Sequence, residues 1–300
     1  MYLSSLVNCN HRQTENVFQE LLQNAAKPKQ LSSNTCSKLC GFVELCSKST
    51  SPVLRAFAFS ENTAIQLFNF YVEWNEQDSH RSMKLVLDFL VYSISRNPVE
   101  QHGTAIKTKI LGDTVTMITR ESSRPSVKSA TACLDFIVQK DIVYLSDVLE
   151  TYREVHGLSA NTDDAWDGLI LKLFIWMELH YVCSVAGKLL ITIFTNPWHK
   201  GGSTRFHPDS WHKFVSRALQ ANHELLEPIK LYVFIPLFKV DRAESLKYLH
   251  DLSSLQSLTS DKSADWDLDS ILWLAMLEAG KKAGFVDEPG TGKSASSSFL

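Results

Sequence analysis

Residues 61–94, ENTAIQLFNFYVEWNEQDSHRSMKLVLDFLVYSI, decide the fold class of this chain. In the first half, Ile65, Phe68 and Val72 recur at the spacing of one helix face. A polar turn follows at residues 75–79, and the second half repeats the same spacing in Met83, Val86, Leu87, Leu90, Val91 and Ile94. The segment therefore predicts two helices joined by a short turn, each with an apolar face that other helices must cover.

The same helix–turn–helix unit recurs further along the chain. Ser60 is expected to cap the helix that begins at Glu61. Asn97-Pro98 ends a helix and Arg124-Pro125 begins one, because proline lacks the N–H that a helix interior needs. Helix starts near residues 61, 104 and 144 are about 40 residues apart, the period of HEAT and armadillo repeats. The pattern predicts an all-α chain folded as an α-solenoid of stacked helix pairs, either entire or as a fragment of a longer array.

Further helices are expected at residues 209–222, 225–238, 243–258 and 267–282. The stretch Leu169–Phe194 is predicted to be a single helix that is apolar on nearly all sides. Its charged residues, Lys172, Glu178 and Lys188, disfavour a membrane span. We expect a helical-repeat array over residues 1–286, with a subdivision at the loop 196–208, and a disordered tail over residues 287–300.

The composition is that of an ordinary globular protein and favours no charged partner. Apolar residues make up 44% and charged residues 21%, and the formal net charge of −3 excludes a general attraction to nucleic acid. Cys36, Cys40 and Cys46 fit a helix as buried small side chains, and the CxxC pairs typical of zinc sites are absent. The sequence start lacks the features of a secretory signal. These features predict free thiols in the cytoplasm or the nucleus.

One string in the tail is similar to a nucleotide-binding loop. Residues 287–294, DEPGTGKS, match the end of the P-loop pattern, but Asp287 stands where that pattern has its first glycine. The chain also ends six residues later, which leaves no room for the helix that should follow the loop. His199, His207 and His212 lack the further ligands of a metal site. We therefore predict no enzyme activity, no cofactor and no bound nucleotide or metal.

The loop after residue 196 is the best binding candidate that the sequence offers. Cationic and aromatic side chains alternate there, and such side chains can contact phosphates and stack on unpaired bases. The alternative is that the aromatic side chains pack against flanking helices and the charges are solvated. The candidate contacts to RNA or to a partner are Trp198, Lys200, Arg205, His207 and Lys213.

Two helical segments resemble a known family. Residues 67–76, LFNFYVEWNE, and residues 126–136, SVKSATACLDF, are similar to the N-terminal parts of fungal armadillo-like proteins of the THADA family. The resemblance implies a helical-repeat accessory protein whose partner, a tRNA 2′-O-ribose methyltransferase, performs the chemistry. The central domain of that family is absent from these 300 residues.

We therefore expect a non-catalytic scaffold that takes part in tRNA 2′-O-ribose methylation through a partner protein, with tRNA as a second candidate partner. A scaffold for ribosome assembly or nuclear transport is the alternative. Nucleotide binding through the tail is a third and weaker interpretation.

Overall fold

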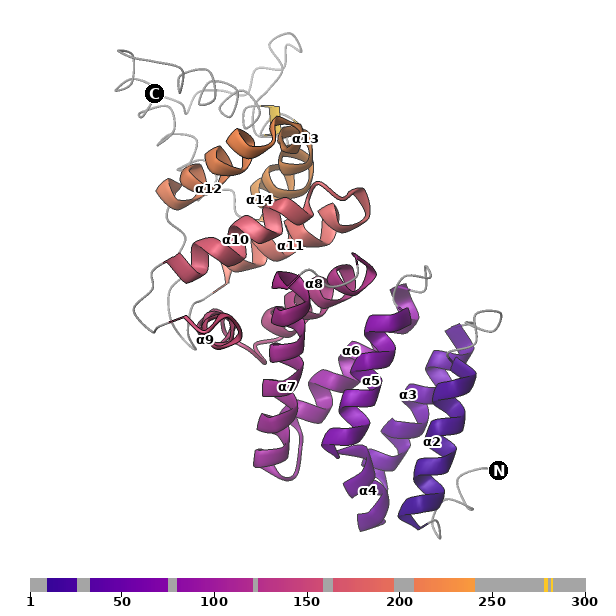
Figure 1. The fold of residues 1–300 in the computed structure, drawn as a ribbon. Coiled ribbons are helices and arrows are strands. Elements are labelled where there is room, and N and C mark those ends of the chain that lie inside the picture. The colour runs from indigo at the N-terminus through magenta and orange to yellow at the C-terminus, as the bar shows by residue number, and fades with distance from the viewer. Residues whose placement is uncertain are drawn as a thin grey trace, which may run out of the picture. The chain divides into compact units, whose positions relative to one another are not determined.

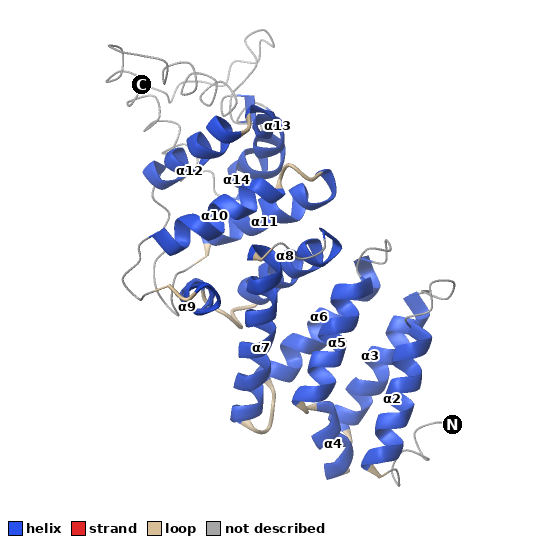
Figure 2. Cartoon of the chain, viewed as in Figure 1, coloured by secondary structure: helices blue, strands red, loops and turns tan. Residues whose placement is uncertain are grey.

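A computed structural model of the chain describes residues 10–25, 33–74, 80–120, 124–158, 164–196, 208–240, 278, 279 and 282. Every regular element in these residues is a helix, which confirms the predicted all-α class (Figures 1 and 2). The α-helices up to the loop are α2 (His11–Ala25), α3 (Ser33–Lys48), α4 (Pro52–Ala58), α5 (Glu61–Trp74), α6 (His80–Ser95), α7 (Glu100–Thr119), α8 (Arg124–Gln139), α9 (Leu145–His156), α10 (Asp164–Trp176) and α11 (His180–Thr195). After the loop come α12 (Pro208–Ala221), the short 3₁₀ segment His223–Leu225, α13 (Leu226–Ile229), the π segment Lys230–Phe234 and α14 (Ile235–Val240).

The chain divides into two compact units. The N-terminal unit contains residues 1–172 and 195–205, and the C-terminal unit contains residues 173–194 and 206–300. The division falls inside α10. The subdivision that we predicted at 196–208 lies almost entirely outside the described residues, as does the tail 287–300.

Helices of the N-terminal unit contact their close neighbours in the sequence. One series of contacts runs through α2, α4, α5, α7 and α9, and a second series runs through α3, α6 and α8. Contacts between the two series join α2 to α3, α3 to α4, α5 to α6, α5 to α8, α6 to α7 and α7 to α8 (Figure 1). Each helix from α2 to α8 therefore has neighbours in its own series and in the other one, and α9 packs on α7.

The predicted apolar faces form the core of this unit. Phe68 of α5 and Val86 of α6 are fully buried, and so are Ile106 of α7 and Leu134 of α8. Side chains three or four positions apart lie on one helix face, so each helix contributes a continuous stripe. Cys40 and Cys46 are also buried, which confirms the prediction for these two cysteines, and the side chain of Cys36 lies outside the described part of the structure. Cys133 of α8 is buried as well.

Most predicted helix boundaries in this unit are confirmed. The Thr63 amide donates to the Ser60 hydroxyl at 3.2 Å, so Ser60 caps α5. α6 ends at Ser95, two residues before Asn97-Pro98, and α8 begins at Arg124. α7 begins at Glu100 rather than near residue 104.

The prediction of a single helix across Leu169–Phe194 is wrong. The chain leaves the α-helix at Met177–Leu179, where the amides of Glu178 and Leu179 donate three residues back, to Ile175 and Trp176. A new helix starts when the Val182 and Cys183 amides donate to the Leu179 carbonyl at 2.8 and 2.9 Å. Because the turn contains neither glycine nor proline, an apolar stretch without periodic polar positions gave no sign of where it would break.

The expected helix at 225–238 is also less regular than predicted. It runs from the 3₁₀ segment through α13 into a π segment, in which the Ile235 amide donates to the Lys230 carbonyl. Pro236 provides the reason, because its ring lacks an N–H and crowds the carbonyl four residues earlier, that of Tyr232. The wider π turn gives that ring room. The helices predicted at 243–258 and 267–282 lie outside the described residues, apart from residues 278, 279 and 282.

Candidate functional site

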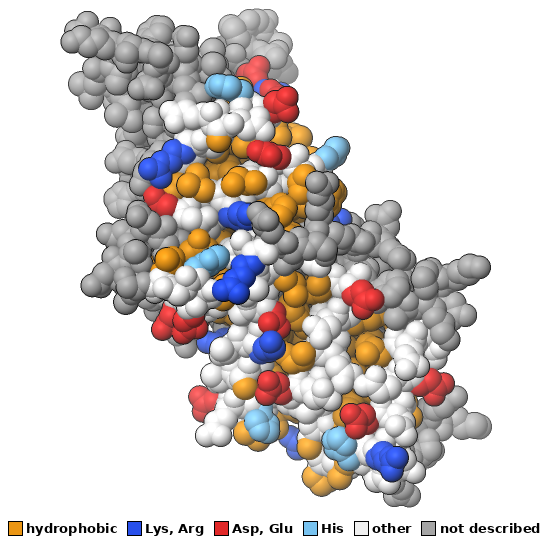
Figure 3. Space-filling model, viewed as in Figure 1, with side chains coloured by type: hydrophobic (Ala, Val, Ile, Leu, Met, Phe, Trp, Pro, Cys, Tyr) orange, Lys and Arg blue, Asp and Glu red, His pale blue; other side chains and the backbone are white. Residues whose placement is uncertain are grey.

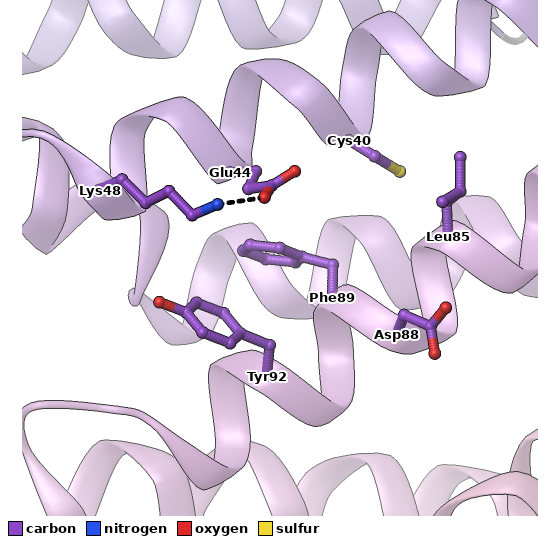
Figure 4. A pocket seen from close by; sticks show the side chains of 7 residues that line it. All are labelled: Cys40, Glu44, Lys48, Leu85, Asp88, Phe89 and Tyr92. Atoms are coloured by element: carbon purple, nitrogen blue, oxygen red, sulfur yellow. Dashed lines mark hydrogen bonds and ion pairs between the residues drawn. The ribbon is translucent and has the colours of Figure 1, made fainter.

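A groove between α3 and α6 is the best-defined candidate site in the N-terminal unit. Its cavity volume is about 390 Å³ (Figure 4). α3 contributes Cys40, Glu44 and Lys48, which are four residues apart and so share one face. α6 contributes Leu85, Asp88, Phe89 and Tyr92, which are three or four residues apart in turn and so also share one face.

The floor of the groove is apolar and well packed. Phe89 is 5% exposed and Cys40 is 7% exposed. The Tyr92 ring lies 6.2 Å from the Phe89 ring and 5.8 Å from the Phe59 ring, centroid to centroid. These contacts fix the two aromatic side chains before anything binds. Leu85 remains 41% exposed at one end of the groove.

Charged side chains line the rim, and they differ between the two ends. Lys48 stands at one end and forms an ion pair with Glu44, and the hydrogen bond that Lys48 donates to Glu44 is the main reason that the pKa of Lys48 is raised. Asp88 lies at the other end beside Leu85 (Figure 4). Asp88 is exposed and has no hydrogen-bond or ion-pair partner among the described residues.

This arrangement offers binding groups rather than catalytic ones. Rigid aromatic rings, an exposed leucine and a carboxylate can hold a side chain that has an aliphatic stem and a cationic head.

A second cavity of about 490 Å³ lies where α4, the start of α5 and the loop before α7 meet. Arg55, Glu61 and His102 line it, and the Asn97 side-chain amide closes one side by donating to the Phe59 carbonyl at 3.0 Å. This cavity has a mixture of charges and no single chemical character. It is the weaker candidate of the two.

Titratable groups also gather at the C-terminal ends of α7 and α9. The His156 Nε2 lies 2.9 Å from the Thr119 hydroxyl, and the Arg120 guanidinium donates to the Val155 carbonyl. Burial, and then the positive charge of Arg120, lower the pKa of His156, which favours its neutral form. The Tyr152 ring stacks 4.5 Å from the His156 ring. These contacts tie two helix ends together, which is a structural role.

The side chains of the sequence-predicted contact residues lie outside the described part of the structure. Trp198, Lys200, Arg205 and His207 lie outside the described residues, and of Lys213 only the backbone, in α12, is described. The prediction that they contact RNA or a partner therefore stays a prediction. The P-loop-like string at 287–294 also lies outside the described residues.

None of the described helices is both long and apolar enough to cross a membrane. Within the same residues, no three His, Cys, Asp or Glu side chains come together as a metal site would require.

Sequence reasoning missed the groove residues. Leu85 and Asp88 lie on the face of α6 away from its predicted apolar stripe, and a leucine outside that stripe was the available signal. Nothing in the sequence told us that the same face of α6 would meet the Cys40–Lys48 face of α3, since α4 and α5 separate the two helices along the chain.

No protein-family model matches this chain, and no curated protein or solved structure is significantly similar to it. The groove must therefore be interpreted from its own geometry.

Proposed function

We propose that this chain is a non-catalytic helical-repeat scaffold of the HEAT/armadillo type that acts by binding a protein partner. The observation that carries the proposal is the pattern of helix contacts in the N-terminal unit, in which helices no more than three apart along the chain stack in two series. A helix pair in such an array cannot bury both apolar faces alone, so neighbouring pairs stack and leave long surfaces for partners.

The groove between α3 and α6 supports a protein rather than a nucleic acid as the partner at this surface. Glu44 is paired with Lys48, so the remaining charge of the groove is the carboxylate of Asp88, which would repel phosphate. Around the N-terminal unit, on the face that Figure 3 shows, Lys and Arg side chains stand singly among acidic and histidine side chains. The continuous basic surface expected of a nucleic-acid binder is not seen on that face.

For the identity of the partner, the resemblance to THADA-like proteins favours a tRNA 2′-O-ribose methyltransferase. The two segments that carry the resemblance lie in α5 and α8, and these helices contact each other. A scaffold for ribosome assembly or nuclear transport is the alternative, and it predicts different partners in the cytoplasm or nucleus.

The test is affinity purification of the full chain after mild crosslinking, with mass spectrometry of the recovered proteins. We expect a defined partner that then binds the purified chain directly, with a fixed stoichiometry in analytical ultracentrifugation. If that partner is a ribose methyltransferase, tRNA methylation should fall when the chain is omitted. Direct binding of no recovered protein would overturn the scaffold proposal. Ribosomal or transport factors would overturn only the methylation assignment.

A further inference from the structure

We propose that the groove between α3 and α6 binds a segment of a partner protein through one arginine side chain and an aliphatic side chain next to it. This inference deepens the proposed function and rests on it. The chemistry of the groove carries the inference in four steps.

The first step is the carboxylate of Asp88. It is exposed in the middle of α6 and has no described partner, although Lys84 lies one helical turn before it. A carboxylate that is held on a rigid helix and not already paired matches the two parallel donors of a guanidinium. Lysine would supply the charge without that geometry.

The second step is the apolar surface beside the carboxylate. Leu85 precedes Asp88 by three residues and is 41% exposed, so it leaves apolar surface beside the carboxylate. An aliphatic side chain of the partner would cover it, and the stem of the arginine would lie along the groove toward Phe89 and Tyr92. Guanidinium groups also stack favourably on aromatic rings.

The third step concerns the end of the groove at which the basic side chain of the ligand binds. Lys48, at the opposite end of the groove from Asp88, is held by Glu44 (Figure 4). Because Lys48 is already paired with Glu44, it does not compete for Asp88, and the neutral pair offers no unpaired carboxylate to a second cation at its own end. The basic side chain of the ligand is therefore directed to the Asp88 end.

The fourth step is the size. A cavity of about 390 Å³ is near the lower end of the range of small-ligand pockets, roughly 300–1,000 Å³. It accommodates a few side chains of a peptide segment rather than the face of a folded domain. The unpaired carboxylate of Asp88 on the rim disfavours a phosphorylated or otherwise anionic segment.

The experiment selects peptides with the full chain. A displayed library of random 12-residue peptides is selected on the wild-type chain and counter-selected on the Asp88→Arg variant. We expect the enriched peptides to share an arginine within one helical turn of Leu, Ile or Phe. The absence of any enriched peptide, or enrichment without a basic residue, would overturn the proposal.

Binding constants then test the individual contacts, by fluorescence anisotropy of the enriched peptide. Asp88→Arg should weaken binding about 10- to 100-fold, the range expected for the loss of a charged hydrogen bond. Glu150→Arg is the matched control, because Glu150 is also an exposed acid in mid-helix, on α9, and the charge change is the same. A glutamate in place of the peptide's arginine should restore binding to the Asp88→Arg variant. If Glu150→Arg weakens binding as much as Asp88→Arg, the groove is not the site.

The outcomes for the two proposals are distinguishable. A partner that is recovered equally well by the wild-type chain and by Asp88→Arg would retain the scaffold and overturn the groove. A tRNA that competes with the peptide for the groove would overturn the assignment of a protein segment. If the cellular partner is lost with Asp88→Arg but retained with Glu150→Arg, the result would support both proposals.

Discussion

Two helices, one in each unit, differ in how closely the neighbouring backbone approaches a glycine. In α7 of the N-terminal unit, a Cβ added at Gly112 would meet no atom within 4 Å. In α11 of the C-terminal unit, a Cβ at Gly187 would lie 2.7 Å from the carbonyl oxygen of Tyr232 and 2.8 Å from its Cβ. Close contacts of this kind are not confined to one unit, because a Cβ at Gly103 of α7 would lie 2.7 Å from the Ile94 carbonyl oxygen. The comparison teaches that apolar stripes can be inferred from hydrophobic periodicity, whereas a close backbone contact at a glycine cannot.

The largest expected effect concerns Lys230, a lysine that is 7% exposed in the π segment. Its ammonium group donates to Glu278 at 2.8 Å and also to Glu227. Lys230→Glu would place a buried carboxylate next to the two exposed ones and leave it without a cation. We expect this to lower the free energy of unfolding by about 3 kcal/mol or more. Chemical denaturation followed by circular dichroism measures the change.

A control in the same place and one in the other unit sharpen this prediction. Lys230→Met should change the free energy of unfolding by only about 1 kcal/mol, because both glutamates are largely exposed and water can solvate them. Lys107, which pairs with Asp147 at 3.5 Å in the N-terminal unit, is about one-third exposed. Lys107→Glu should therefore also cost only about 1 kcal/mol. Equal losses of stability for Lys230→Glu and Lys107→Glu would mean that the deeper burial of Lys230 does not set the cost of the substitution.

The glycine pair predicts effects of opposite sign. Gly187→Ala forces the new methyl group against the backbone of Tyr232, so we expect a loss of about 1–3 kcal/mol. Gly112→Ala adds a methyl group in open space and improves helix propensity, so we expect a gain of about 0.5–1 kcal/mol. Both changes are read from urea unfolding curves. A stabilising Gly187→Ala would show that α11 and the π segment are not in close contact.

Alkaline pH tests the buried core of the N-terminal unit. Burial raises the pKa of the Cys133 thiol from 9.0 to about 12, so the unfolded chain ionises this thiol first. The stability that the neutral buried thiol contributes is complete below pH 9 and is lost as the pH rises toward 12. Relative to Cys133→Ala, the wild-type chain should lose about 1.4 kcal/mol between pH 8 and pH 10.

The control for this pH effect is Val127→Ala, which removes a buried side chain from the same helix without removing a thiol. Its difference from the wild type should not change between pH 8 and pH 10. A constant difference for Cys133→Ala as well would mean that water reaches the thiol in the folded chain.

The sequence predicted those features of the fold that depend on local signals. Apolar spacing gave the all-α class and the helix start at Glu61, and the chemistry of proline gave the start at Arg124 and the stop before Pro98. The break at Met177–Leu179 did not, because no residue there is a helix breaker. The groove was missed because it depends on which faces of α3 and α6 meet, and this is a tertiary property that spacing within one helix does not contain.

The smallest expected effect is that of Asp88→Arg on folding. Asp88 is exposed and without a described partner, so its substitution should change the free energy of unfolding by no more than about 0.5 kcal/mol. Glu150→Arg should be equally mild. Thermal unfolding of the two variants beside the wild-type chain checks this, and helix content by circular dichroism should not change. A marked loss with Asp88→Arg would show that the carboxylate stabilises α6 itself. In that case the substitution would change the helix as well as the charge, and a loss of peptide binding could no longer be attributed to the groove.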